Sequence, residues 1–192
     1  MPQINQAALD FLHTRRSRPW RTLGLPVPER GELEGMLTAA ARVPDHGKLE
    51  PWRFIVLERA ALQRLADLAE ARATPLGIEA DKIAKGVDIY RQAHLAVMVI
   101  SCPVPSEKVP EIEQIYSAGA VCLGLLNAAL ASGWGANWLS GWATHDREFM
   151  RDGLGLAPGE SIAGYVPIGA ETCIPPERPR PDIDAKTDWI ST

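Results

Sequence analysis

One long stretch of this chain carries no charged side chain, and it constrains the fold more than any other feature. No Asp, Glu, Lys or Arg occurs between Glu113 and Asp146. A membrane-spanning helix needs about 20 mostly apolar residues, but polar residues and glycines interrupt this stretch, and its apolar members are largely alanine. We therefore expect no membrane span. The pattern predicts a wholly buried helix over residues 112–131, followed by a buried strand or loop.

The composition is that of an ordinary globular protein. The 192 residues are 46% hydrophobic and 23% charged, which predicts one domain with enough apolar surface to form a core. The formal net charge of -4 argues against a nucleic-acid partner. Three cysteines without a C-x-x-C pair argue against a disulfide framework and favour a reducing compartment. The N-terminus does not resemble a signal peptide, so we expect a cytoplasmic protein.

Hydrophobic periodicity predicts helices that flank a few strands, which is typical of an α/β or α+β sandwich. The near-continuous apolar run over residues 95–101 indicates a strand covered on both faces. The tail from Glu171 is rich in Pro and Arg and is expected to be extended. The predicted helices span residues 5–16, 29–42, 60–72, 78–91, 112–131 and 146–154, and the predicted strands span residues 53–58, 95–101, 135–139 and 162–168.

The sequence lacks the common catalytic and metal-binding motifs. The four histidines lie far apart and none has a partner at metal-ligand spacing, so we expect no metal site. No G-x-G-x-x-G follows a strand, and neither a Walker A motif nor a G-x-S-x-G elbow is present. Cys122 lies inside the predicted buried helix, where thiols are usually inert. No side-chain nucleophile is therefore identified.

Basic residues gather at two places in the sequence. Residues 15–18, Arg-Arg-Ser-Arg, follow the first predicted helix. Guanidinium groups beside a hydroxyl suit a terminal phosphate, although a solvated cation cluster at a helix C-terminus explains the same residues. Arg178 and Arg180 could add two phosphate contacts, or could belong to an exposed proline-rich tail.

Three tryptophans, Trp134, Trp138 and Trp142, recur at a spacing of four. Indole rings can stack on a flat heterocycle while hydroxyl and backbone N–H groups bond its edge, but a place in the hydrophobic core is the commoner explanation. The segment 44–48 precedes Pro51-Trp52 in a predicted loop that leads into a strand. Such loops often carry function, and an ordinary turn beside a packed Trp fits equally well.

Taken in order, these features resemble the FMN-dependent nitroreductases of the small, single-domain branch. The resemblance covers nearly the whole chain, and its specificity lies in the order and spacing of markers that are weak singly. The markers are Arg15-Arg16-Ser17, Ala41-Arg42-Val43-Pro44-Asp45-His46, Pro51-Trp52-Arg53-Phe54, Tyr116-Ser117-Ala118-Gly119, residues 133–141, and Tyr165-Val166-Pro167-Ile168-Gly169.

The resemblance implies an α+β fold, a three-layer sandwich whose central, mostly antiparallel sheet is flanked by helices. It also implies an intertwined homodimer with an FMN at each of two sites on the subunit interface. The uncharged helix would then be buried between subunits, since obligate interfaces resemble a domain core cut in half.

The resemblance also implies which residues bind the cofactor. Arg15, Arg16 and Ser17 would hold the FMN phosphate and ribityl chain, and Arg178 and Arg180 would add contacts to the phosphate. Arg42 and His46, from the loop after the second predicted helix, would make further contacts with the cofactor. Trp138, Leu139 and Ser140 would lie beside the isoalloxazine ring.

The implied reaction is a ping-pong hydride transfer through flavin N5, with NAD(P)H as donor and a nitroaromatic, quinone or similar small molecule as acceptor. A positive charge near the pyrimidine edge of the ring would stabilise the anionic reduced flavin, and Arg42 or Lys48 could supply it. The chain departs from many relatives at Pro19, where a basic residue is common, and at Lys48 and Glu50, where Asn and Gln are common.

Two alternatives remain open at this point. One is another flavin enzyme on the same scaffold, of the dehalogenase or flavin-fragmenting type. The other is a non-catalytic flavin-binding or redox-sensing protein. The sequence distinguishes neither NADH from NADPH nor one physiological acceptor from another.

Overall fold

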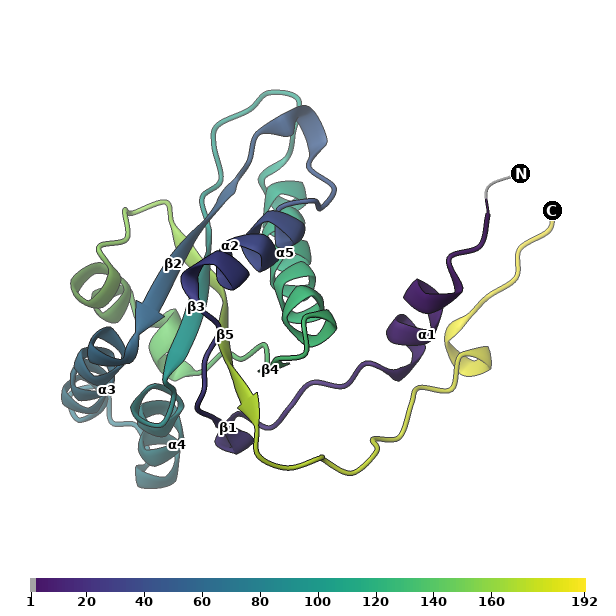
Figure 1. Cartoon of the computed structure of the whole chain (residues 1–192). Coiled ribbons are helices and arrows are strands. Elements are labelled where there is room, and N and C mark those ends of the chain that lie inside the picture. The colour runs from purple at the N-terminus through teal and green to yellow at the C-terminus, as the bar shows by residue number, and fades with distance from the viewer. Residues whose placement is uncertain (1–2) are drawn as a thin grey trace.

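A central antiparallel sheet organises the chain in a computed structural model, which describes residues 3–192 (Figure 1). The strand order is β1-β5-β3-β2, and β4 pairs with β5 as well. Every pairing is antiparallel, which confirms the mostly antiparallel sheet expected from the family resemblance. The strands are β1 (Leu23–Gly24), β2 (Trp52–Glu58), β3 (Leu95–Ser101), β4 (Gly135–Ala136) and β5 (Ser161–Glu171).

The strand β3 lies inside the sheet, and all seven of its residues are buried. Because successive side chains of a strand point to opposite faces, Met98 belongs to the core beneath α3 (Arg59–Ala73) and α4 (Ala80–Arg91). Val97 belongs to the core beneath α2 (Arg30–Ala40) and α5 (Glu111–Ala131) on the other face. The result is the predicted three-layer sandwich, with helix pairs on both sides of the sheet (Figure 1).

The longest helix, α5, differs from its prediction. Its buried side packs on α2, β3 and β5, but only 44% of its most apolar window is buried. The expectation of a wholly buried helix is therefore wrong for the single chain. Length and composition alone would let this helix span a membrane. In this fold it instead covers one face of the sheet and leaves a second apolar face open, formed by Ile112, Ile115, Tyr116 and Leu123.

Several boundaries also differ from the sequence-based prediction. The strand expected over 135–139 is only two residues long, because the backbone leaves the ladder after Ala136 and returns in a single bridge from Leu139 to Tyr165. The short helix expected over residues 146–154 is present over residues 147–154, and its central part, Phe149–Gly153, is π-helical. The two-residue strand β1 was not predicted, since so short a pairing leaves no periodicity to read.

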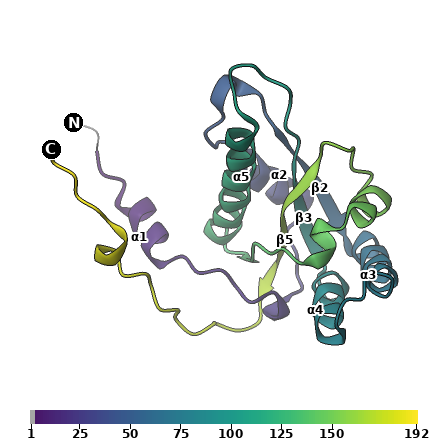
Figure 2. The ribbon, with the colours of Figure 1, turned by 180° about the vertical axis from the view of Figure 1, so that it is seen from behind.

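The first helix and the tail form an arm that extends away from the sandwich (Figures 1 and 2). The helix α1 (Gln6–Thr14) begins after Asn5, whose side chain accepts a hydrogen bond from the backbone N–H of Ala8. No residue of α1 is buried. The tail runs beside α1 in both views, largely without regular structure, as predicted. Its large apolar side chains Ile174, Ile183, Trp189 and Ile190 are exposed.

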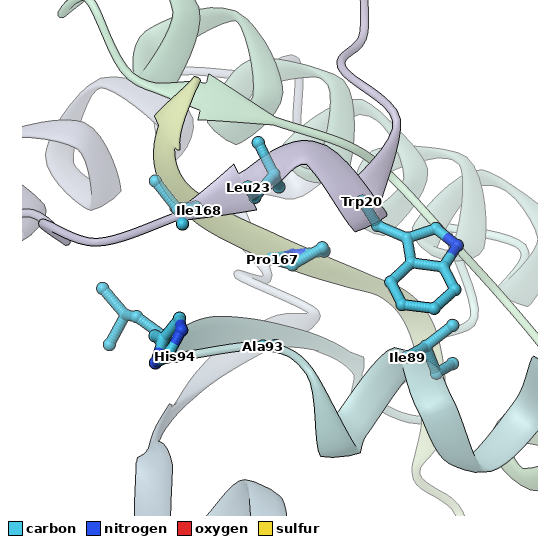
Figure 3. A pocket seen from close by; sticks show the side chains of 9 residues that line it. Trp20, Leu23, Ile89, Ala93, His94, Pro167 and Ile168 are labelled. Carbon is cyan, nitrogen blue, oxygen red and sulfur yellow. The ribbon is translucent and has the colours of Figure 1, made fainter. Parts of the chain in front are cut away.

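The arm joins the sandwich at a short helical turn, Trp20–Thr22, followed by β1. Figure 3 shows Trp20 facing Ile89 of α4, with Leu23 and Pro167 beside it. Leu23 pairs with Glu171, so the start and the end of the arm are joined through the sheet. This junction anchors both ends of the arm to the sandwich, at Trp20 and at Glu171.

A glycine on β5 makes room for Trp138. A Cβ atom at Gly164 would lie 2.3 Å from the indole Nε1 of Trp138 and 2.8 Å from the Cys122 sulfur. The same indole nitrogen donates a hydrogen bond to the Ala163 carbonyl at 3.3 Å. Trp138 can therefore occupy this position only because residue 164 is a glycine and has no Cβ atom.

Replacing Gly164 by Ala is expected to lower the free energy of unfolding by about 1–3 kcal/mol, because a crowded core must shift to admit the methyl group. Urea denaturation measures this change. Gly159→Ala is the matched control, since no atom lies within 4 Å of a Cβ placed there. Equal stability of the two variants would contradict the packing described here.

Candidate functional site

The segment between α1 and the sandwich gathers several arginines, two of which have a buried N–H group without a hydrogen-bond partner among residues 3–192. Arg15 donates from Nη2 to the Ser17 hydroxyl at 3.1 Å, and Arg16 donates from Nη1 to the Ser17 carbonyl at 3.0 Å. The Nε atoms of Arg15 and Arg16 are buried and have no hydrogen-bond partner among residues 3–192. Buried donors are normally satisfied, so these two N–H groups indicate a missing acceptor.

The tail adds another cation to this segment. Burial lowers the pKa of Arg15, and the charges of Arg180, Arg16 and Arg18 lower it further. Arg18 is paired with Glu171 at 2.6 Å, whereas the guanidinium of Arg180 contacts Glu177 within its own tail at 2.9 Å. An anion bound among these like charges would offset their mutual repulsion. We call Arg15, Arg16, Ser17 and Arg180 the arginine cluster.

Arg178, the other tail residue implied by the resemblance, is not drawn into this cluster. Its backbone N–H donates to the Glu177 carboxylate at 2.9 Å. That hydrogen bond is the largest cause of a lowered pKa of Glu177, and the charges of Arg180 and Arg16 follow. The structure therefore connects Arg180, but not the Arg178 side chain, with the arginines that follow α1.

Two hydrogen bonds tie the arginine segment to the residues after β4. The Arg18 N–H donates to the Ala136 carbonyl at 2.9 Å, and the Asn137 side chain donates to the Arg18 carbonyl at 2.7 Å. Leu139 then exchanges two backbone hydrogen bonds with Tyr165, at 2.9 and 3.0 Å. Trp138 and Ser140 flank this bridge and are exposed. One chain thus brings the predicted phosphate and ring contacts into adjoining segments.

A cavity of about 320 Å³ lies beside Leu139 and Ser140 and exposes cations that the sequence analysis missed. Lys82 and Lys85 lie one turn apart on α4, and Arg21 stacks on Trp20 at 4.2 Å. Lys82 pairs with Glu79 at 2.8 Å, while Lys85 has no ion pair within the described residues. The helical spacing of the two lysines is visible in the sequence, but only the fold places them next to Ser140. The cavity lining comprises Trp20, Arg21, Lys82, Lys85, Gly86, Ile89, Leu139, Ser140, Gly141 and Trp142.

Of the other two predicted contacts, Arg42 follows α2, whose last residue Ala40 packs against Gly124 inside α5, and only His46 lies at the start of α5. His46 binds Glu113 in the first turn of α5, whereas Arg18 binds Ala136 beyond the other end of that helix. A helix rises 1.5 Å per residue, so about 27 Å of helix axis separates Glu113 from Ala131. Figure 1 shows the loop of His46 near the start of α5 and the arm near its end. A single protomer therefore holds His46 apart from the arginine cluster.

Comparison with known proteins identifies the class to which this fold and these residues belong. The nitroreductase family model matches residues 12–170, which is most of the chain. The chain belongs to the nitroreductase family.

Individual relatives agree with this assignment. A Haemophilus influenzae protein named as an NAD(P)H nitroreductase is 35% identical over 164 residues, which cover 84% of this chain and 87% of that protein. A nitroreductase-like protein from Bacillus cereus has the same fold, with a TM-score of 0.79, 23% identity and coverage of 99% and 98% of the two chains. A Desulfovibrio desulfuricans structure, described as a nitroreductase in complex with FMN, aligns over 100% of both chains with a TM-score of 0.74 and 20% identity.

The arginine cluster is expected to bind inorganic phosphate. An anion at ten times its Kd adds about 1.4 kcal/mol of stability, which raises Tm by about 3–5 °C in a chain of this size. Differential scanning fluorimetry in phosphate and in chloride of equal ionic strength measures the difference. The double variant R15Q/R16Q should lose the phosphate-specific increment. R151Q should keep it, because Arg151 pairs on the surface with its neighbour Asp152. An equal response of wild type and R15Q/R16Q would contradict the anion site.

Proposed function

We propose that this protein is an FMN-dependent oxidoreductase that uses NAD(P)H to reduce small acceptors of the nitroaromatic or quinone type. The observation that carries this proposal is the arginine cluster, in which two buried guanidinium N–H groups lack an acceptor beside a hydroxyl. Membership of the nitroreductase family and the FMN complex of a structural relative support the same conclusion.

The residues of the arginine cluster fit the phosphate end of FMN. Guanidinium groups suit a terminal phosphate because they offer several donors in a rigid fork. Arg15 and Arg16 each keep a donor unused, and Ser17 supplies a hydroxyl between them. A phosphate here would also relieve the repulsion between Arg15 and Arg180.

The ring of the cofactor fits the cavity that begins at Leu139 and Ser140. Trp20 and Trp142 give this cavity flat apolar walls, and Lys82 and Lys85 place positive charge at its rim. These lysines share the cavity with Ser140, so we favour them over Arg42 and Lys48 as the cations at the pyrimidine edge. When bound, FMN would supply the redox chemistry that connects the nicotinamide donor with the acceptor. The protein would hold the cofactor through the arginine cluster and stabilise negative charge on the ring edge through Lys82 and Lys85.

The complete site requires a second copy of the chain. Both α1 and α5 expose apolar side chains, as does the tail, and exposed apolar surface of this extent marks an interaction site. A homodimer that covers these faces would bring Arg42 and His46 of the partner subunit to the arginine cluster. This arrangement explains why one protomer holds His46 apart from the arginine cluster.

Mixed dimers test the shared site. R16A and H46A are each expected to weaken FMN binding in both sites of their own homodimers. In the mixed dimer, one site combines an intact Arg16 with the partner's intact His46, and the other carries both substitutions. Differently tagged chains, co-expressed and purified through both tags, should therefore bind one FMN per dimer with wild-type affinity. A mixed dimer that binds FMN no better than its parents would contradict a site built from two chains.

The native protein is expected to be yellow and to catalyse electron transfer from NADH or NADPH to an acceptor. Its flavin absorbance should bleach on addition of NADH or NADPH without oxygen, and should return on addition of a nitro or quinone acceptor. R16A should raise the Kd for FMN at least about tenfold, the size expected for a charge-assisted hydrogen bond worth roughly 1.4 kcal/mol or more.

Two results would overturn this proposal in different ways. Flavin bands that are missing and do not form on addition of FMN would exclude a flavoprotein. Bound FMN that neither nucleotide bleaches would identify a non-catalytic flavin-binding protein instead.

A further inference from the structure

We propose that Glu113 is a positioning residue that orients His46 toward the cofactor and fixes which ring nitrogen carries the proton. The inference rests on the proposed function, in which His46 contacts FMN. Glu113 is not one of the predicted cofactor-binding residues. It lies on α5, whereas His46 lies in the loop before β2.

The contact itself is short and joins distant parts of the chain. The His46 Nδ1 atom lies 2.7 Å from a carboxylate oxygen of Glu113, which is 67 residues further along the sequence. The two side chains are 59% and 45% exposed in the single chain. An ionised carboxylate only accepts hydrogen bonds, so this geometry requires the proton on Nδ1. The Nε2 atom is then the nitrogen left for the cofactor.

The backbone that carries His46 is held in an uncommon conformation. Gly47, Lys48 and Glu50 have φ values of 75°, 54° and 48°. Positive φ is rare for residues other than glycine, and such positions concentrate at functional sites. The Asp45 carboxylate supports this turn by accepting the Glu50 N–H at 2.8 Å. The loop is thus built to present His46 at one place.

The same helix holds the base of the loop through a second residue. Ser117 lies one turn after Glu113 on α5 and donates its hydroxyl to the Pro44 carbonyl at 2.8 Å. The Trp52 indole N–H donates to the same hydroxyl at 3.2 Å. Ser117 therefore fixes the two ends of the loop, and Glu113 is left to fix the side chain in its middle.

A division of labour follows from these contacts. Ser117 acts on the backbone, so its loss would disturb the whole loop. Among residues 3–192 the Glu113 side chain hydrogen-bonds the His46 imidazole and not the loop backbone, so its loss would leave the loop in place and free the ring to rotate and to exchange tautomers. The hydrogen bond made by one ring nitrogen of a histidine determines the state of the other.

A matched set of variants separates this role from a purely structural one. Glu113 also lies in the first turn of α5, where a carboxylate stabilises the helix dipole. Glu111 shares that turn and makes no hydrogen bond to His46, so E111A reports the loss of the helix-dipole effect alone. E113A removes the acceptor, whereas E113Q keeps an amide oxygen that can accept from Nδ1.

The first measurement needs no cofactor. Nitrogen-15 NMR of the FMN-free protein labelled at histidine, with the His46 signals assigned by their loss in H46N, should report the Nδ1–H tautomer at a pH where the ring is neutral. E113Q and E111A should retain this tautomer, and E113A should lose it. The same tautomer in the wild type and in E113A would overturn the inference.

The second measurement is the affinity for FMN, followed by the quenching of flavin fluorescence. E113A should raise the Kd about tenfold, a change of roughly 1.4 kcal/mol, while E113Q and E111A should stay within about threefold of the wild type. Circular dichroism and urea denaturation of each variant establish that it is folded. An unchanged Kd in E113A would overturn the inference. A wild-type protein that binds no FMN would instead overturn the proposed function and leave the tautomer result to decide the role of Glu113.

Discussion

The packing of α5 on the sheet is the constraint on which the rest of the molecule depends. One side of this helix covers β3 and β5, and α2 packs beside it. Charged side chains are excluded from the rest of the helix after its first turn, although less than half of its apolar window is buried within one chain. The exposed apolar side is the face that the proposed homodimer would cover. His46 and the arginine segment lie toward the two ends of this helix.

The layers of the fold could be predicted because they depend on local periodicity. The apolar run of β3 and the 3.6-residue patterns of the helices are properties of short segments, and the observed bounds of β2 and β3 lie within a residue of the prediction. The short pairings of β1 and β4 could not be predicted, because two-residue strands are defined by contacts with β5 rather than by their own sequence. The exposed face of α5 could not be identified either, since a helix against the core and a helix between subunits have the same composition.

In the candidate site, too, residues within a short sequence motif could be predicted, whereas residues brought together only by the fold could not. Residues 15–17 form a recognisable motif, so the phosphate contacts were proposed from the sequence and stay proposals that the anion measurements address. The lysines of α4 were missed because nothing in residues 82–85 points to Ser140, which is more than fifty residues away along the chain. Glu113 was missed for the same reason. A carboxylate at the start of a helix is common, and only the folded loop brings His46 against it.

The course of the tail has a practical consequence for handling this protein. Arg180 sits beyond the last strand, on a segment whose large side chains are not buried in the chain's own core. A chain shortened just after β5 would retain every strand of the sheet and both core clusters, yet it would lack one member of the arginine cluster. Shortened forms of the chain therefore need a test of anion or cofactor binding, because normal folding would not reveal this loss.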